Sequence, residues 1–269
     1  MTYPGRACGI ALLIAAALFV PNSFSKEQVD IAPLALQRSA QSSCNRDRFR
    51  IVLDIGHTAE EPGATSARGV PEFVFNFRLA QYLRQQLIGA GFAQTEVLIT
   101  AGASFSGLLQ RVASVNRMAP NLFLSIHHDS VPAAFLERWE YAGGQQRFSD
   151  QFRGHALFIS SENSHFQASL LFARRLGYEL KARGLQYASH YTQPFMGKHR
   201  RELLDAEVGV YRFDQLLVLR KTQVPAVLLE AGSIVNRDEE LELGSRERQA
   251  TIGAAVTQAV EVFCSLPPS

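Results

Sequence analysis

Short apolar runs and longer segments with helical periodicity alternate along the chain from about residue 49 to its end. Runs without polar alternation are typical of parallel strands that are buried on both faces. They predict strands at residues 49–55, 95–100, 122–126, 155–160, 216–219 and 224–229. Apolar residues three or four apart predict helices at residues 72–87, 108–118, 166–180 and 246–263. This order predicts a single α/β domain, in which helices flank a twisted, mostly parallel sheet of about six strands.

Three stretches lack this periodicity. Residues 58–71 contain two glycines and two prolines, which favours a loop. Residues 132–154 hold the only tryptophan, Trp139, and predict an inserted loop or a short helix. Residues 188–213 are rich in His, Tyr, Arg and Gly, and a loop of this length in a compact domain is usually functional or mobile. No internal repeat or second domain is apparent.

The N-terminal stretch predicts an exported protein. Arg6 precedes an apolar segment at residues 8–20, which is short for a membrane span, and Pro21 interrupts it. We therefore expect residues 1–25 to be a secretory signal peptide that is cleaved after Ser25; a membrane anchor is the alternative. Residues 26–48 are then a polar leader or linker, and residues 49–265 the folded domain. The mature protein would lie in the periplasm or cell envelope, without a membrane span.

Cysteine content and charge narrow the picture further. Cys8 would leave with the signal peptide, so Cys44 and Cys264 remain near the two ends of the domain. In an oxidising compartment such a pair predicts a disulfide, with two free thiols as the alternative. A net charge of +2 and the absence of a dense Lys/Arg cluster argue against a nucleic-acid partner.

Three of the predicted strands end in side chains that bind metals. His57 and His127 follow two apolar strands, and Glu230 ends a third. Ligands bind at the carboxyl ends of strands in open α/β sheets, so these side chains are candidates for one site. Two imidazoles and one carboxylate leave a position open on Zn²⁺, which is the catalytic pattern. A carboxylate that is not a ligand can then act as a general base.

Five short motifs occur in order over residues 50–263, and together they resemble the zinc-dependent N-acetylmuramoyl-L-alanine amidases that separate bacterial daughter cells. As they stand in this chain, the motifs are Asp54-Ile55-Gly56-His57; Gly69-Val70-Pro71-Glu72 with Asn76; Arg111 with Asn116; Ser125-Ile126-His127; and Leu229-Glu230-Ala231-Gly232 with Asn236. The resemblance covers nearly the whole predicted domain.

The resemblance implies a hydrolase of peptidoglycan that cleaves the amide bond between N-acetylmuramic acid and L-alanine of the stem peptide. It implies one Zn²⁺ per chain, held by His57, Glu72 and His127, with Glu230 as the catalytic base. Taken alone, Glu72 is also explained as a first-turn carboxylate favoured by the helix dipole. Two rival functions are another zinc peptidoglycan peptidase, such as a carboxypeptidase, and a catalytically inactive wall-binding protein.

The chain departs from the family pattern after Ser125-Ile126, where His127-His128-Asp129 replaces the usual His-Ala-Asn. His128 is therefore an alternative ligand, but neighbouring strand residues point to opposite faces, and His127 holds the family position. Asp54 would either orient His57 or cap the turn, and Asp129 would do the same for His128. His155 and His165 are not expected to be ligands, and the same holds for His190 and His199, which are candidates for substrate contact.

Some relatives are gated by an inserted helix that covers the zinc until a protein activator displaces it. Residues 133–153 are the candidate segment here, with Glu137 or Glu140 as a fourth ligand. The alternative is an ordinary surface excursion without a gating role.

Overall fold

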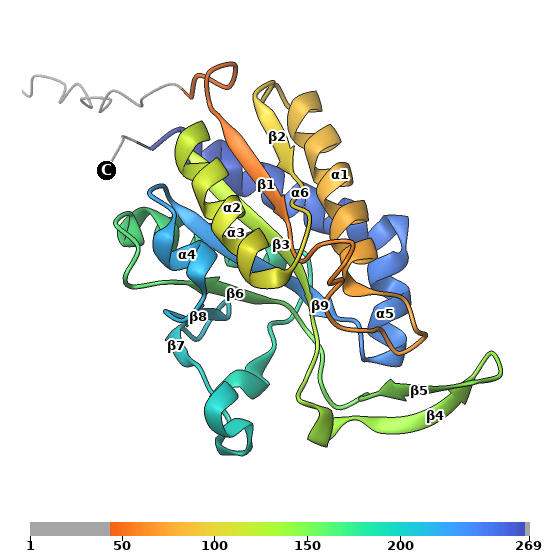
Figure 1. Cartoon of the computed structure of the whole chain (residues 1–269). Coiled ribbons are helices and arrows are strands. Elements are labelled where there is room, and N and C mark those ends of the chain that lie inside the picture. Colours follow the sequence, from red (N-terminus) through yellow and green to blue (C-terminus); the bar gives the residue numbers. More distant parts are fainter. Residues whose placement is uncertain (1–43, 267–269) are drawn as a thin grey trace, which may run out of the picture. The chain divides into compact units, whose positions relative to one another are not determined.

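The structure, a computed structural model, describes residues 44–266 and has a seven-stranded sheet at its centre (Figure 1). Across the sheet, the strand order is β2-β1-β3-β9-β6-β8-β7. The strands are β1 (Ile51–Ile55), β2 (Thr95–Leu98), β3 (Leu122–Asp129), β6 (Ala156–Ile159), β7 (Glu202–Asp205), β8 (Val210–Arg212) and β9 (Ala226–Ser233). The predicted signal peptide at residues 1–25 and most of the predicted linker lie outside the described residues.

The sheet has a parallel half and a mixed half. β2, β1, β3 and β9 run parallel to one another. β6 is antiparallel to β9 and parallel to β8, and β7 is antiparallel to β8. The predicted α/β fold with a mostly parallel sheet is confirmed. The carboxyl ends of β1, β3 and β9 meet at one edge, which is where open α/β sheets bind ligands.

Helices cover both faces of the sheet (Figure 1). α1 (Glu72–Gly89), α3 (Phe166–Ala182), α5 (Arg237–Gly244) and α6 (Arg246–Cys264) lie on one face. α2 (Ser104–Met118) and α4 (Leu217–Lys221) lie on the other. Among the described residues, no helix is both long enough and apolar enough to cross a membrane.

Alternate residues of each central strand enter different hydrophobic cores. Leu53 and Leu124 belong to the core that includes side chains of α1, α3 and α6. Val52 and Phe123 belong to the core that includes side chains of α2 and α4. Successive side chains of a strand point to opposite faces, so the same alternation sets the direction of the polar residues at the strand ends.

The prediction of a strand at residues 216–219 is wrong, because these residues form the start of helix α4. Val218 and Leu219 are buried against the sheet, whereas Leu217 is only partly buried. A four-residue apolar run has no readable period, so the sequence does not distinguish a buried strand from one helical turn.

Residues 132–154 form a β-hairpin after a short 3₁₀ turn, η1 (Ala133–Phe135), and not a loop or α-helix. β4 (Glu137–Tyr141) pairs antiparallel with β5 (Gly144–Phe148) in a separate two-stranded sheet. The two connecting residues, Ala142 and Gly143, both have positive φ angles. Tight two-residue hairpin turns require that conformation, and glycine supplies it without steric cost.

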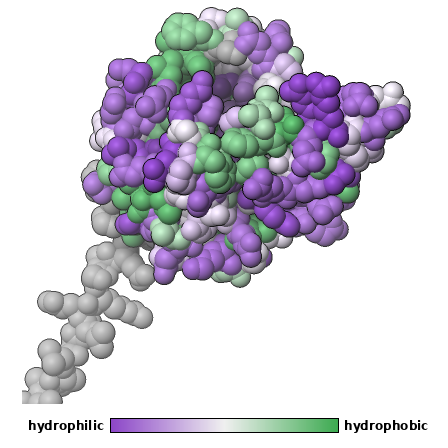
Figure 2. Space-filling view, turned by 90° about the horizontal axis from the view of Figure 1, so that it is seen from below, coloured by the Kyte–Doolittle hydropathy of each residue, from purple (hydrophilic) through white to green (hydrophobic). Residues whose placement is uncertain are grey.

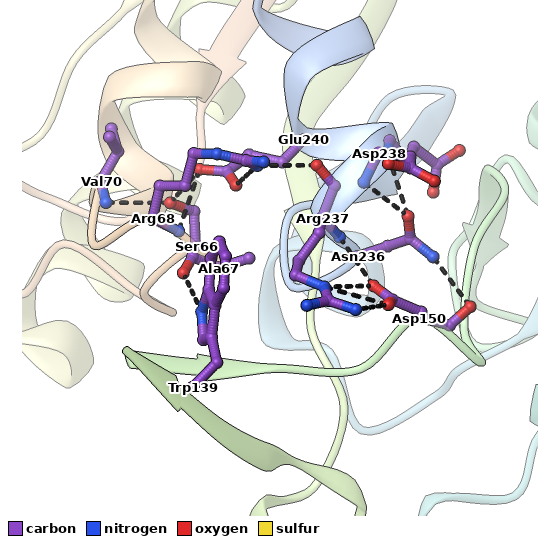
Figure 3. Close-up of polar contacts among 11 residues, drawn as sticks. Ser66, Ala67, Arg68, Val70, Trp139, Asp150, Asn236, Arg237, Asp238 and Glu240 are labelled. Carbon is purple, nitrogen blue, oxygen red and sulfur yellow. Dashed lines mark hydrogen bonds and ion pairs between the residues drawn. The ribbon is translucent and has the colours of Figure 1, made fainter. Parts of the chain in front are cut away.

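Polar and aromatic contacts fix the hairpin to the domain (Figure 3). The Trp139 indole donates a hydrogen bond to the carbonyl of Ala67 at 2.9 Å. The guanidinium groups of Arg68 and Arg237 lie 5.5 and 5.2 Å from the Trp139 ring centroid. Arg237 also forms an ion pair with Asp150, just beyond β5. These contacts hold the hairpin beside the loop that precedes α1.

The long segment predicted as a loop at residues 188–213 has more structure than expected. It contains the 3₁₀ turns η2 (Ser189–Thr192) and η3 (Pro194–His199), followed by β7 and β8. These two strands are only four and three residues long, too short for a visible alternation of polar and apolar positions. They complete the mixed edge of the sheet.

The predicted disulfide between Cys44 and Cys264 is confirmed. Their Cα atoms lie 5.1 Å apart, and the bond joins the beginning of the described region to the end of α6. It closes a separation of 220 residues. A cross-link over so long a separation strongly restricts the unfolded chain.

Candidate metal centre

Three metal-binding side chains converge at the carboxyl edge of the parallel strands. His57 follows β1, Glu72 is the first residue of α1, and His127 lies near the end of β3. One potential ligand atom from each lies within 4.8 Å of the others, the only such group of His, Cys, Asp or Glu residues among those the structure describes. Figure 2 views the molecule from this end, where hydrophobic residues lie between larger hydrophilic areas.

Glu72 bridges the two imidazoles. Its Oε2 lies 3.0 Å from Nε2 of His57, and its Oε1 lies 3.0 Å from Nδ1 of His127. Burial alone would raise the pKa of Glu72. The hydrogen bonds and electrostatic interactions with His127 and His57 outweigh this and hold the pKa of Glu72 well below its usual range. The carboxylate is therefore ionised, the form that binds a cation.

Three further donors hold the Glu72 carboxylate. Oε2 accepts a hydrogen bond from the backbone N–H of Ala64, and Oε1 accepts one from the side chain of Asn76. The backbone N–H of His128 also donates to Oε1 at 3.3 Å. Asn76 lies one helical turn after Glu72 and also donates to the carbonyl of Gly56. Asn76 thus connects α1 to the turn that carries His57.

A buried ion pair holds the backbone of His57. His57 has a φ angle of 67°, which is uncommon for a residue with a side chain. Arg111 of α2 donates to the His57 carbonyl at 2.8 Å and pairs with Asp54 at 2.7 Å. Asp54 also accepts a 2.6 Å hydrogen bond from Ser125. Neither expectation for Asp54 is met, because it acts on the turn through Arg111.

Two glycines leave room for the metal-binding side chains. A Cβ atom on Gly56 would lie 2.4 Å from the His127 ring. A Cβ atom on Gly63 would lie 2.5 Å from both Glu72 and His57, and Gly63 has a φ angle of +81°. A side chain at either position would displace a member of the cluster.

His127 and His128 point to opposite faces of β3, as strand geometry requires. His127 joins the cluster, whereas His128 Nδ1 lies 2.7 Å from the Asn76 side-chain oxygen and the ring packs against Phe75. Burial lowers the pKa of His128 to about 3. His128 is therefore neutral, and it orients the amide of Asn76.

Glu230 lies on β9 directly opposite His127 in the strand register. It lines the same ≈ 280 Å³ cavity as His57 and His127. Its Oε2 is buried and has no hydrogen-bond partner among the described residues. Burial, followed by the negative charges of Asp129 and Glu72, raises the pKa of Glu230 well above its usual value. The other lining residues are Ser130, Pro132, Phe158, Tyr191, Met196, His199, Arg201, Phe213, Leu216 and Leu228.

Asp129 does not orient His128, contrary to expectation, but lies near residues of the turn η2. Its Oδ2 lies 3.8 Å from Nε2 of His190, and Tyr191 donates a hydrogen bond to the carboxylate. Burial raises the pKa of Asp129 to about 7 and lowers that of His190 to about 4. Of the two histidines suggested for substrate contact, His199 lines the cavity.

The inserted segment does not form the helix expected of a gate. Glu137 and Glu140 are exposed on β4, and neither belongs to the cluster or lines the cavity. Figure 1 shows the hairpin at the lower right, below the loop that precedes α1.

The sequence model of the N-acetylmuramoyl-L-alanine amidase family matches residues 51–262, most of the chain. The chain belongs to this family. The match contains all three members of the cluster as well as Glu230. Family membership and named relatives support peptidoglycan amidase activity, and the grouped His57, Glu72 and His127 fit a metal site in this family.

The relatives share only about a quarter of their residues with this chain, but the matches cover most of its length. The chain is 24% identical over 225 residues to N-acetylmuramoyl-L-alanine amidase AmiA of Escherichia coli (strain K12), and the match covers 78% of this chain and 74% of the relative. It is 25% identical over 230 residues to the uncharacterized protein YqiI of Bacillus subtilis (strain 168), which covers 86% and 92% of the two chains.

Solved structures of amidases share the fold. The amidase Ami1 from Mycobacterium smegmatis aligns with a TM-score of 0.62 at 20% identity, over 82% of this chain and 98% of the other. The CwlD amidase from Clostridioides difficile, in complex with the GerS lipoprotein, aligns with a TM-score of 0.57 at 19% identity, over 80% and 98%.

Sequence reasoning missed the roles of several residues around the cluster. Arg111 and Asn76 belonged to recognised motifs, but their contacts with the His57 turn were not predicted. Tyr191 and Arg201, which line the cavity, lie in the segment without periodicity. Only the clustering of His, Tyr and Arg in that segment pointed to a functional role.

Proposed function

We propose that this chain is a zinc-dependent N-acetylmuramoyl-L-alanine amidase that cleaves the bond between N-acetylmuramic acid and L-alanine of peptidoglycan. The supporting observation is the cavity that His57, His127 and Glu230 line together, where the Glu72 carboxylate bridges the two imidazoles. The family match is the second support. The exported domain would comprise residues 49–265, after cleavage of a signal peptide at residues 1–25.

The proposed ligands are His57, Glu72 and His127, and the residues present fit a zinc ion. Ligands about 2.1 Å from a common tetrahedral centre lie roughly 3.4 Å apart. His57 Nε2 and His127 Nδ1 each lie 3.0 Å from a different oxygen of Glu72, and one ligand atom from each of the three residues lies within 4.8 Å of the others. Two glycines also keep Cβ atoms out of this space. Bound Zn²⁺ lowers the pKa of water to about 7 and polarises a carbonyl oxygen.

Glu230 is the proposed general base. Its orphan Oε2 accepts a proton from the attacking water while the water oxygen bonds to the lactyl carbonyl carbon. The carboxyl group then gives that proton to the L-alanine nitrogen as the carbon–nitrogen bond breaks. A cation held by His57, Glu72 and His127 would lower the pKa of Glu230 from the raised value that burial produces, and so would favour the basic form.

Binding of a protein activator is a further part of the proposal. CwlD of C. difficile was solved in complex with a lipoprotein, so partner binding occurs on this fold.

The decisive experiment is to digest purified sacculi with the mature protein and identify the new chain ends by mass spectrometry. We expect release of peptides with a free L-alanine amine, loss of release with a chelator, and recovery when Zn²⁺ is restored. Release of a C-terminal amino acid would instead support a carboxypeptidase. Sacculi that bind the protein but stay intact would support a wall-binding protein.

A further inference from the structure

A polar hollow of ≈ 490 Å³ adjoins the candidate active site. It shares His199, Arg201 and Phe213 with the cavity that contains His57, His127 and Glu230. Only these side chains form the common wall. The other lining residues are Lys198, Arg200, Glu202, Arg212, Asp214 and Gln215.

The carboxylates of this hollow are already paired with one of its cations. Arg212 lies 2.7 Å from the carboxylate of Glu202 and 3.4 Å from that of Asp214. Asp214 also accepts hydrogen bonds from Ser160 and Ser161. Both negative charges are therefore balanced within the hollow or bound to nearby donors.

Three cations of the same hollow have no such partner. Within residues 44–266, no carboxylate lies within ion-pair distance of Lys198, Arg200 or Arg201. Lys198 and Arg200 are exposed on either side of His199, which faces the cavity. Like charges placed together repel one another unless an anion joins them, so this arrangement favours a negatively charged ligand.

Arg201 is held in place between the two hollows. Its guanidinium carbon lies 3.7 Å from the centroid of the Phe213 ring. Its NH1 donates to the backbone carbonyls of Lys198 and Arg200, at 3.1 and 3.0 Å. Its buried Nε has no partner among the described residues. An ordered guanidinium loses less entropy on binding a carboxylate than a free one does.

We propose that Lys198, Arg200 and Arg201 bind the carboxylates of the peptidoglycan stem peptide while the scissile amide lies at the metal centre, an inference that rests on the proposed amidase function. The peptide side of the scissile bond carries free carboxylates, whereas the sugar rings are uncharged. The cationic hollow therefore sets the direction of the substrate, because the peptide must leave the metal centre past Arg201.

Hydrolysis of two matched substrates tests this assignment with the zinc-loaded mature protein. One substrate is an N-acetylmuramoyl tripeptide with free carboxylates, and the other is the same compound with these carboxylates amidated. The double variant K198Q/R200Q removes two cations but leaves Arg201 in the cavity wall. We expect its KM for the acidic substrate to rise about three- to tenfold with little change in kcat.

The amidated substrate supplies the discriminating comparison. Wild-type protein should already have a raised KM for the amidated substrate, and K198Q/R200Q should not raise that KM further. The matched control K181Q/R84Q removes two exposed cations that line neither hollow, and it should leave both substrates unchanged. An equal loss of activity on both substrates, or no loss on the acidic one, would overturn the assignment.

A binding measurement separates this inference from the amidase proposal. Calorimetry with the free tripeptide product needs no turnover, so it reports on the hollow even if neither substrate is hydrolysed. We expect the acidic peptide to bind wild-type protein three- to tenfold more tightly than the amidated peptide, and K198Q/R200Q to remove the difference. Equal or undetectable binding of both peptides contradicts the hollow's role. Absent hydrolysis with charge-dependent binding contradicts only the amidase proposal.

Discussion

Two regions around the candidate metal centre differ in how their carboxylates are hydrogen-bonded. On the side of β1 and α1, Glu72 lies between two imidazoles and accepts three further hydrogen bonds. On the side of β9 and η2, Glu230 has an unpartnered buried oxygen, and the Oδ2 of Asp129 is also without a hydrogen-bond partner among the described residues. The pKa of Glu72 is lowered, and the pKa values of Glu230 and Asp129 are raised.

This difference corresponds to two chemical tasks. A ligand must keep its charge and position, which many donors ensure. A proton acceptor must change its protonation state during the reaction, and fixed partners on both oxygens would oppose that change. Pairs of titratable groups whose surroundings separate their pKa values are typical of acid–base sites.

The largest expected effects, on activity and zinc content, come from replacing Glu230 or Glu72 with glutamine. E230Q should retain zinc and lose about 10³-fold in kcat, because a proton acceptor is removed. E72Q should lose both zinc and activity, because the amide weakens the ligand and directs an N–H₂ group at existing donors. Metal content by mass spectrometry and hydrolysis of sacculi measure the two effects. Zinc loss from E230Q with retention in E72Q would reverse the assignment of roles.

Breaking the buried ion pair behind His57 should affect stability most. D54N leaves the guanidinium of Arg111 buried and unpaired, so we expect the free energy of unfolding to fall by about 3–5 kcal/mol in denaturant titrations. The control D150N breaks the exposed pair with Arg237 and should barely move the unfolding midpoint. Equal stability of D54N and wild type would show that the ion pair does not support the inner side of the site.

A single methyl group should weaken the metal centre without removing a ligand. In G56A, the added Cβ would lie 2.4 Å from the His127 ring and push it from the cluster. We expect zinc affinity to fall about 10- to 100-fold, as for other residues that orient a ligand. G89A is the matched control, because its Cβ meets no atom within 4 Å. Competition with a chromophoric chelator measures both, and unchanged affinity in G56A would contradict the packing argument.

A smaller effect is expected on the pH dependence of stability, from His155 immediately before β6. Burial lowers the pKa of His155 to about 4, so between about pH 6.5 and 4 the unfolded chain binds a proton that the folded chain does not. Stability attributable to His155 is then lost as pH falls, by up to about 1.4 kcal/mol per pH unit. H155Q should flatten the slope of unfolding free energy against pH relative to wild type. The raised pKa of Asp129 has the opposite effect on stability, but both proteins contain Asp129, so its contribution cancels in the comparison. Parallel plots of unfolding free energy against pH for H155Q and wild type would contradict the prediction.

The ligand residues were predictable because they end or begin regular elements. Apolar runs located β1, β3 and β9, and the order of motifs assigned His57, Glu72, His127 and Glu230 to one site. Alternation along a strand indicated that only one of His127 and His128 faces the site, and the family position favoured His127. By contrast, the hairpin, α4 and the pair β7 and β8 were missed, because each is too short for its period to be visible.

The sequence by itself determined the fold class, because strand and helix periodicity depends on local residue order. The two cysteines left after the signal peptide predicted the disulfide, and the resemblance to the amidase family implied the four side chains of the proposed chemistry. Only the tertiary structure decided which polar groups have partners. Arg111 reaches His57 from α2, and the three unpaired cations near His199 come together with Arg212 across a turn and a strand edge. Arg111 and His57 lie 54 residues apart in the chain, so no local pattern predicts their contact. The cations near His199 are close in sequence, but the sequence does not show that they lack a carboxylate partner among the described residues.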